Sequence, residues 1–215
     1  MGASLEGDVT LRGVKSDVET EFSDILEKLN FAAQVHAEAR RNRLGFFGDL
    51  LFMQLSDEQD ADSLKIETTA QIAIVEVGTK YRVGSFDLPW GGNVGVDTLV
   101  SGRYWRTRTE IDLSLGLSDV DRTVDWVDLI VGGTALLELS DRWNLNVRAD
   151  LGGFGIGSGT DRSIFVRAMF RYQFTEDWST LFGYSILDAE LDRGTKRLKA
   201  AIRLDGIALA FERRF

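Results

Sequence analysis

Cysteine and histidine, two residue types common in catalytic and metal sites, are scarce in this chain of 215 residues. It has no cysteine and a single histidine. The lack of cysteine excludes a disulfide framework and every cysteine-based nucleophile or metal site. One histidine cannot form a multi-histidine metal centre. The sequence therefore predicts neither a cofactor nor a bound metal ion.

Long apolar runs and an excess of positive charge are also missing. No run approaches 18 apolar residues, which excludes a transmembrane helix but not the short, alternating strands of a membrane barrel. The net charge of −9 argues against nucleic acid as the main partner, because phosphate binding requires a basic surface. The start, residues 1–4, lacks a basic and apolar signal sequence, so export implies that a signal peptide has been removed.

What the sequence does contain is alternation. In segment 31–40, for example, Phe31 and Val35 share one parity, whereas His36 and Glu38 share the other. A strand with this pattern has an apolar face and a polar face. We find no linker or composition change, so residues 1–215 are expected to form one domain. The predicted strands are 5–14, 31–40, 44–55, 66–82, 94–113, 126–139, 145–154, 164–174, 180–189 and 196–215.

The connections between these strands differ in length. Short turns are expected at 40–43 and in two near copies, Ser140-Asp-Arg-Trp143 and Thr175-Glu-Asp-Trp178, with the longer link 83–93 as the exception. Short turns at one rim and long loops at the other are typical of bacterial outer-membrane barrels. In the first loop, segment 22–29 has apolar residues at helical spacing after Ser23, a suitable N-cap, which predicts a short helix. The expected long loops are 15–30, 56–65, 114–125, 155–162 and 190–195.

The C-terminal ten residues carry a further pattern. They end on an aromatic residue, and one parity holds Ile207, Leu209, Phe211 and Phe215. This tail resembles the C-terminal assembly signal of bacterial outer-membrane barrels, although Arg213 occupies a position that is usually apolar. With the strand pattern, the chain resembles the small, 8–10-stranded outer-membrane β-barrel proteins of Gram-negative bacteria. The resemblance implies a monomer in the outer membrane, with membrane lipids, lipopolysaccharide and the barrel assembly machinery as partners.

The expected fold is therefore all-β: a closed antiparallel transmembrane β-barrel of about ten strands, with short periplasmic turns and longer extracellular loops. About eight strands already leave an interior that side chains fill. Large residues such as Phe47, Leu51, Met53, Leu99 and Trp105 would also project inward, so we predict a packed, salt-bridged lumen with at most a narrow path. The charged residues expected to line it mix both signs: His36, Glu38, Arg40, Asp49, Glu76, Asp97, Arg103, Asp128, Arg148, Asp150, Arg167 and Arg171.

Aromatic residues near the strand ends favour lipid around the barrel, because such residues form interfacial girdles. The predicted girdle consists of Tyr81, Tyr104, Trp126, Trp143, Tyr172 and Trp178. The alternative is a soluble β-barrel that binds an apolar ligand, resembling lipid carriers of the fatty-acid-binding class. Those carriers are much shorter chains and lack the terminal aromatic residue.

The function expected from this pattern is non-enzymatic: a structural or surface-interaction role, or a narrow pore for small solutes. The alternative is an outer-membrane hydrolase acting on lipid or peptide. Proteases of the omptin type also have ten strands, but they use paired acids with a histidine at the extracellular rim. Here His36 lies within a strand and no Asp-x-His pair exists, so we interpret it as structural.

Two loops look like ligand-binding motifs and are better explained otherwise. The acidic segment 57–62 lacks the glycine and terminal glutamate of a calcium-binding EF-hand loop. With other acidic loop residues it is expected to form an acidic rim, which could hold divalent cations that bridge to lipopolysaccharide, but a set of solvated charged loops is the preferred interpretation. The glycine-rich segment 152–159 follows a strand, but no helix follows it, so it lacks the geometry of a phosphate loop.

Overall fold

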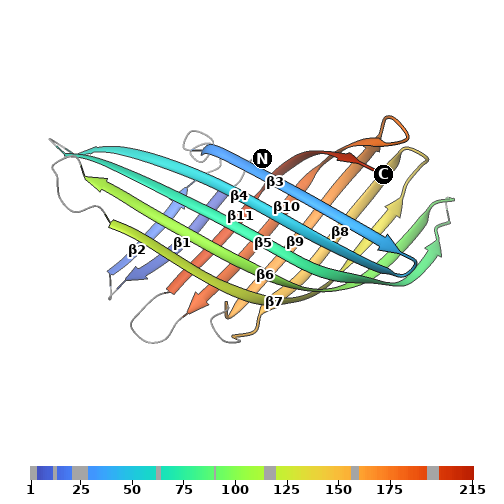
Figure 1. Ribbon diagram of the computed structural model, residues 1–215, viewed down its shortest axis with the longest axis horizontal. Coiled ribbons are helices and arrows are strands. Elements are labelled where there is room, and N and C mark those ends of the chain that lie inside the picture. Colours follow the sequence, from blue (N-terminus) through green and yellow to red (C-terminus); the bar gives the residue numbers. More distant parts are fainter. Residues whose placement is uncertain are drawn as a thin grey trace.

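The computed structural model describes residues 4–11, 14–20, 29–61, 64–89, 91–113, 120–155, 160–192 and 199–215. Within these residues, eleven strands form one antiparallel sheet (Figure 1). The all-β antiparallel fold expected from the sequence is therefore confirmed. No helix in the described part of the chain is long and apolar enough to cross a membrane.

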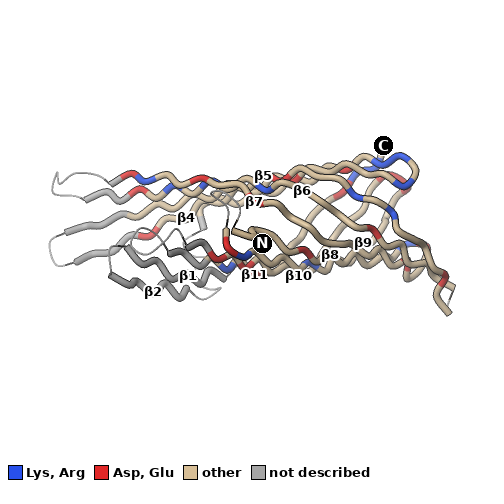
Figure 2. The backbone as a smooth tube through the Cα atoms, turned by 90° about the horizontal axis from the view of Figure 1, so that it is seen from below, with Lys and Arg blue, Asp and Glu red and all other residues tan. Residues whose placement is uncertain are grey.

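The strand order across the sheet is β2-β1-β11-β10-β9-β8-β7-β6-β5-β4-β3. From β3 to β11 each strand pairs with the next one in sequence, and β1 pairs with β11. In Figure 2, β5 and β6 lie along one side of the molecule and β10 and β11 along the other, so the sheet is curled. The strands are β1 (Ser4–Leu11), β2 (Val14–Thr20), β3 (Leu29–Arg41), β4 (Leu44–Ala61), β5 (Leu64–Asp87), β6 (Asn93–Leu113), β7 (Val120–Glu138), β8 (Trp143–Gly153), β9 (Arg162–Gln173), β10 (Trp178–Asp192) and β11 (Lys199–Arg213).

All five expected long loops are partly strand, most extensively 15–30, 56–65 and 114–125, where β7 already begins at Val120. The expected loop 15–30 contains β2, which pairs with β1 along its whole length. Residues 21–28, which hold most of the expected helix, lie outside the described residues, and Leu29 begins β3. The expected loop 56–65 was also wrong, because β4 continues to Ala61 and pairs there with the start of β5. Acidic side chains suggested a loop, but the backbone ladder continues beneath them.

The three predicted short turns lie where the sequence places them, and the link expected at 83–93 is shorter, because β5 continues to Asp87 and β6 begins at Asn93. Figure 1 shows the connections 42–43, 88–92, 139–142 and 174–177 at one end of the sheet, together with the C-terminus. The two similar turn sequences share one geometry: the Ser140 hydroxyl accepts from the Trp143 backbone N–H at 3.2 Å, and Thr175 accepts from Trp178 at 3.0 Å. Such side-chain caps stabilise tight turns. We refer to this end as the turn end.

Alternation along the strands gives the sheet a buried inner face and an exposed outer face. On β6, Leu99, Arg103 and Trp105 are at most 2% exposed, whereas Val100 is 51% and Tyr104 36% exposed. Neighbouring strands keep the same parity through the pairing register, so Arg103 lies beside Glu76 and Asp128. The inner face therefore carries most of the charge and the outer face most of the large exposed apolar residues.

The four neighbouring strands β4 to β7 are longer than the others. β5 has 24 residues and β6 has 21, and β4 and β7 have 18 and 19. A strand that crosses a bilayer needs roughly 9–11 residues. The extra length lies at the end opposite the turn end, where β7 continues beyond its pairing with β8, which covers only Ile130 to Glu138.

Candidate functional site

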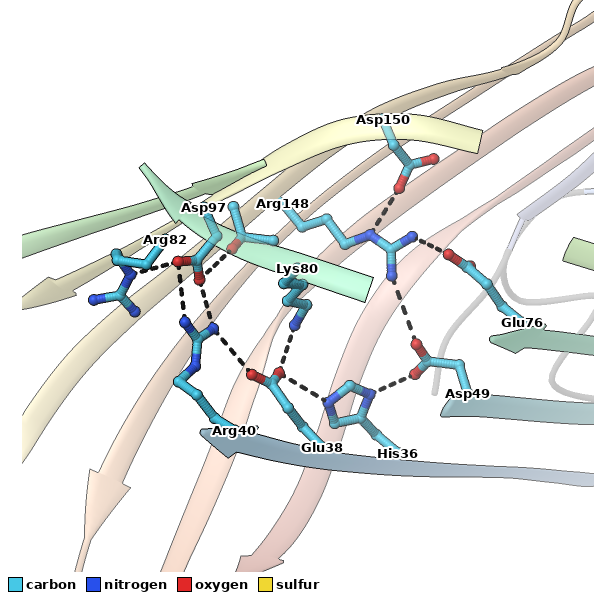
Figure 3. A network of polar contacts seen from close by, with 11 residues as sticks. His36, Glu38, Arg40, Asp49, Glu76, Lys80, Arg82, Asp97, Arg148 and Asp150 are labelled. Atoms are coloured by element: carbon cyan, nitrogen blue, oxygen red, sulfur yellow. Dashed lines mark hydrogen bonds and ion pairs between the residues drawn. The ribbon is translucent and has the colours of Figure 1, made fainter. Parts of the chain in front are cut away.

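The inner face is organised around a cluster of buried ion pairs, the central cluster: Asp49, Glu76, Arg103, Arg148 and Asp150. The Arg148 side chain donates to Glu76 at 2.5 Å and to Asp150 at 2.7 Å. Arg103 contacts the same two carboxylates, at 2.9 and 3.1 Å. Because these residues come from β4, β5, β6 and β8, the contacts join strands that are not neighbours in the sheet (Figure 3).

His36 extends this cluster toward the edge strand β3. Its Nδ1 lies 2.8 Å from Asp49 Oδ1, and its Nε2 lies 3.8 Å from Glu38. Asp49 also lies 3.5 Å from the Arg148 Nη1 atom. No partner for His36 could be identified from the sequence, because Asp49 becomes its neighbour only through the β3–β4 register. Because His36 lies between the carboxylates of Asp49 and Glu38, it connects them within an ion-pair network.

A second group of charges, the turn-side cluster, lies closer to the turn end: Glu38, Arg40, Lys80, Arg82 and Asp97. Lys80 Nζ contacts Glu38 at 2.5 Å, and Arg40 reaches Asp97 at 2.7 Å. Arg82 also donates to Asp97. Lys80 and Arg82 were not among the predicted residues. The signal was present for both, because they share the parity of Glu76 on the same strand.

On the side away from the turn end, the charges give way to an apolar layer. The indole rings of Trp105 and Trp126 stack with their centroids 5.4 Å apart. They pack with Leu187 and Leu204 from β10 and β11, so the layer joins opposite walls of the curled sheet. Asp128 is fully buried beside it and accepts from Trp105 Nε1 at 2.9 Å and from the Thr160 backbone N–H at 2.7 Å. The layer comprises Ile72, Ile74, Trp105, Trp126, Leu187, Ala189 and Leu204.

The structure places the two remaining predicted charges, Arg167 and Arg171, on the inner face of β9. Arg171 pairs with Glu212 at 3.2 Å. Arg167 has no ion pair with a described residue, and its guanidinium lies 5.8 Å from the Phe165 ring. The Nε atoms of both arginines are buried without a hydrogen-bond partner among the described residues.

Five of the six predicted girdle residues lie on the outer face, and Trp126 does not. Trp143 and Tyr172 lie close together, with ring centroids 4.8 Å apart. Trp126 is only 3% exposed and belongs to the apolar layer. The prediction used its position near a strand end and overlooked its parity, which it shares with Asp128. The five predicted girdle residues on the outer face are Tyr81, Tyr104, Trp143, Tyr172 and Trp178.

The C-terminal strand exposes its apolar parity. Ile207, Leu209 and Phe211 are 61%, 64% and 71% exposed. The Arg213 guanidinium lies between two rings, 5.5 Å from Trp178 and 4.9 Å from Phe215. Its aliphatic stem and flat cation therefore occupy an aromatic setting at a position where the resembled signal carries an apolar residue.

Away from the turn end, the outer face changes from apolar to charged residues. On β6 and β7, beyond Tyr104 and Val127, the Arg108 side chain contacts Glu110 at 2.6 Å and Asp121 at 2.8 Å. The hydrogen bond from Arg108 lowers the pKa of Asp121 below its usual value. On β9 and β10 the change is marked by Arg162, which contacts Glu190 at 3.0 Å. The apolar outer band therefore has a polar border away from the turn end.

The described side chains offer little for bound-metal chemistry. No group of three or more histidine, aspartate or glutamate side chains among them is arranged to hold a metal ion. Most carboxylates of the two clusters are held by arginine or lysine. The arrangement ties strands together through charge pairing and fills the interior of the curl.

No protein-family model and no curated protein sequence matches this chain. Among solved structures, it is similar to the translocator domain of autotransporter NalP from Neisseria meningitidis. The two chains are 13% identical with a TM-score of 0.36, and the alignment covers 99% of this chain and 86% of that one. A likeness at this level carries no information on function.

Proposed function

We propose that this chain is an integral outer-membrane β-barrel with a polar, salt-bridged and largely packed lumen, and that its role is structural or in surface interaction. The observation that carries the proposal is the distribution of side chains between the two faces. In a soluble β-protein, the charged parity faces water and the apolar parity fills the core. Here Asp128, Arg148 and Asp150 are at most 3% exposed, while Val77, Ile207 and Leu209 are more than 60% exposed.

The height of the outer apolar band supports a bilayer as its surroundings. On β6, outward-facing residues from Val94 to Tyr104 span ten residue steps, or roughly 33 Å along the strand. With the usual tilt of a barrel strand, this corresponds to a band about 25 Å high, the height typical of outer-membrane barrels. Soluble monomers rarely expose an apolar patch of such extent.

Backbone chemistry requires that a sheet in lipid be closed, because an open edge would leave polar groups unpaired. We infer that the edge strands β2 and β3 pair with each other in the membrane. The packed interior favours a structural barrel over an open pore, since side chains of the central cluster and the apolar layer reach across it. The non-enzymatic role remains part of the proposal.

The test uses tryptophan fluorescence in vesicles of brominated phosphatidylcholine, whose bromine atoms quench residues that contact acyl chains. With Trp90 changed to Phe, one variant keeps only the outer pair Trp143 and Trp178, and the other only the inner pair Trp105 and Trp126. We expect strong quenching of the outer pair and little quenching of the inner pair. The opposite order, or a protein that stays monodisperse without detergent, would overturn the membrane proposal.

A further inference from the structure

Arg167 is a cation of the interior that forms no ion pair with the described residues. On the inner face of β8 and β9 it lies directly opposite Arg148 in the pairing register. Like charges in directly opposed positions destabilise a sheet unless another group compensates them. Arg148 has three carboxylates around it, whereas Arg167 has no carboxylate within ion-pair distance among the described residues. Its Nε atom is buried and makes no hydrogen bond to them.

Each nearby carboxylate already forms an ion pair with another residue. Glu76 and Asp150 each accept from both Arg103 and Arg148. Asp49 pairs with His36 at 2.8 Å through Oδ1, whereas its Oδ2 lies 3.5 Å from Arg148 and makes no hydrogen bond to a described residue. A buried cation without a compensating anion is costly. The compensation for Arg167 is therefore expected from outside the described chain.

The wall beside Arg167 carries small residues. In the same row, β10 places Ser185 and β11 places Gly206 on the inner face. Both side chains are small, and the serine hydroxyl is a hydrogen-bond donor. The rows on either side hold larger residues: Phe165 with Leu187 away from the turn end, and Met169 toward it.

We propose that Arg167 and Ser185 form a binding site for a small oxyanion, such as inorganic phosphate or a carboxylate. A guanidinium presents two parallel N–H donors that match an oxyanion, and the hydroxyl would supply a third. Arg171, four residues closer to the turn end on the same face, is already paired with Glu212 at 3.2 Å, which leaves Arg167 as the cation available to the anion. The inference rests on the proposed function, because it takes the inner face as the lumen.

The experiment is a titration of inorganic phosphate into the refolded protein in a non-ionic, phosphate-free detergent at constant ionic strength. The readout is calorimetric heat together with the urea midpoint of unfolding.

We expect saturable binding that R167Q weakens at least tenfold and S185A weakens severalfold. R167K, which keeps the charge without the fork, should fall between wild type and R167Q. R162Q, which removes an exposed arginine of the outer face, should bind like wild type. A parallel arm with acetate separates a carboxylate ligand from phosphate.

Without phosphate, R167Q should be at least as stable as wild type, because the substitution removes an uncompensated cation. If R167Q is instead destabilised equally with and without phosphate, Arg167 pairs with Asp49 in solution and the site does not exist. Binding that does not saturate, or that R162Q reduces as much as R167Q does, has the same consequence. Brominated-lipid quenching of Trp143 and Trp178 that persists in that case leaves the membrane proposal standing.

Discussion

At the scale of single residues, Arg148 forms ion pairs with more carboxylates of the interior than any other described side chain. It is 2% exposed and contacts Asp49, Glu76 and Asp150. Removing one partner of a buried pair leaves the other charges uncompensated, which costs about 3–5 kcal/mol. We therefore expect R148A to lower the free energy of unfolding by about that amount, measured by urea titration of the protein refolded in liposomes.

The matched control is Arg162, which also forms ion pairs but is exposed. Its partners are Asp188 and Glu190, at 3.8 and 3.0 Å. Exposed pairs contribute about 0–1 kcal/mol. Equal costs for R148A and R162A would show that the central cluster is hydrated, in contradiction to a packed lumen.

The residue scale also shows what sequence can and cannot supply. Parity along a strand placed Arg103, Arg148 and Asp150 on one face without any knowledge of their contacts. The pairing of His36 with Asp49 could not be predicted, since it depends on the register between two strands. Trp126 was misplaced because its nearness to a strand end outweighed its parity in the prediction.

At the scale of elements, the close approach of β9 and β10 depends on Gly183. A Cβ atom at this position would lie 2.0 Å from the Ala168 backbone oxygen and 2.8 Å from the Met169 sulfur. Overpacking of this kind costs typically about 1–3 kcal/mol. We expect G183A to lower the urea midpoint accordingly, while G102A, where a Cβ meets nothing within 4 Å, should change the free energy of unfolding by less than about 0.5 kcal/mol.

A second element-scale prediction concerns the border of the apolar band on β7. Val131 is 40% exposed within the band, and Thr123 is exposed beyond it. An arginine facing lipid near the midplane costs about 2–4 kcal/mol, and near the interface about 0–1 kcal/mol. We expect V131R to destabilise the protein in liposomes by the larger amount and T123R by the smaller. Equal effects of the two substitutions would mean that no lipid surrounds Val131.

Element boundaries were predictable where turn chemistry was specific. The hydroxyl caps of Ser140 and Thr175 mark two turns in the sequence as clearly as in the structure. The continuation of β4 to Ala61 was missed, because aspartate and glutamate are uncommon in strands and favour a loop prediction. A long ladder with β5 overrides that local preference.

At the scale of the whole molecule, polar and apolar layers succeed one another along the interior. The turn-side cluster comes first, then the central cluster, and then the apolar layer around Trp105 and Trp126. The sequence predicted which side chains project inward, but the order of the layers follows from the stagger of the strands. That stagger is set by the pairing register across the sheet, which alternation alone does not encode.

This layering makes a prediction about conduction. Arg103 and Trp105 are adjacent inner residues of β6, one in the central cluster and one in the apolar layer, and both are at most 2% exposed. Because they belong to separate layers, removing both side chains should open a water-filled path through the central cluster and the apolar layer. We expect wild-type protein in a planar lipid bilayer to give no persistent conductance steps and the R103A/W105A variant to give them. T98A/Y104A, which shortens two outer residues of the same strand, should behave like wild type. Persistent steps from wild type would mean that a continuous water path passes the central cluster, and the barrel would then act as a narrow pore.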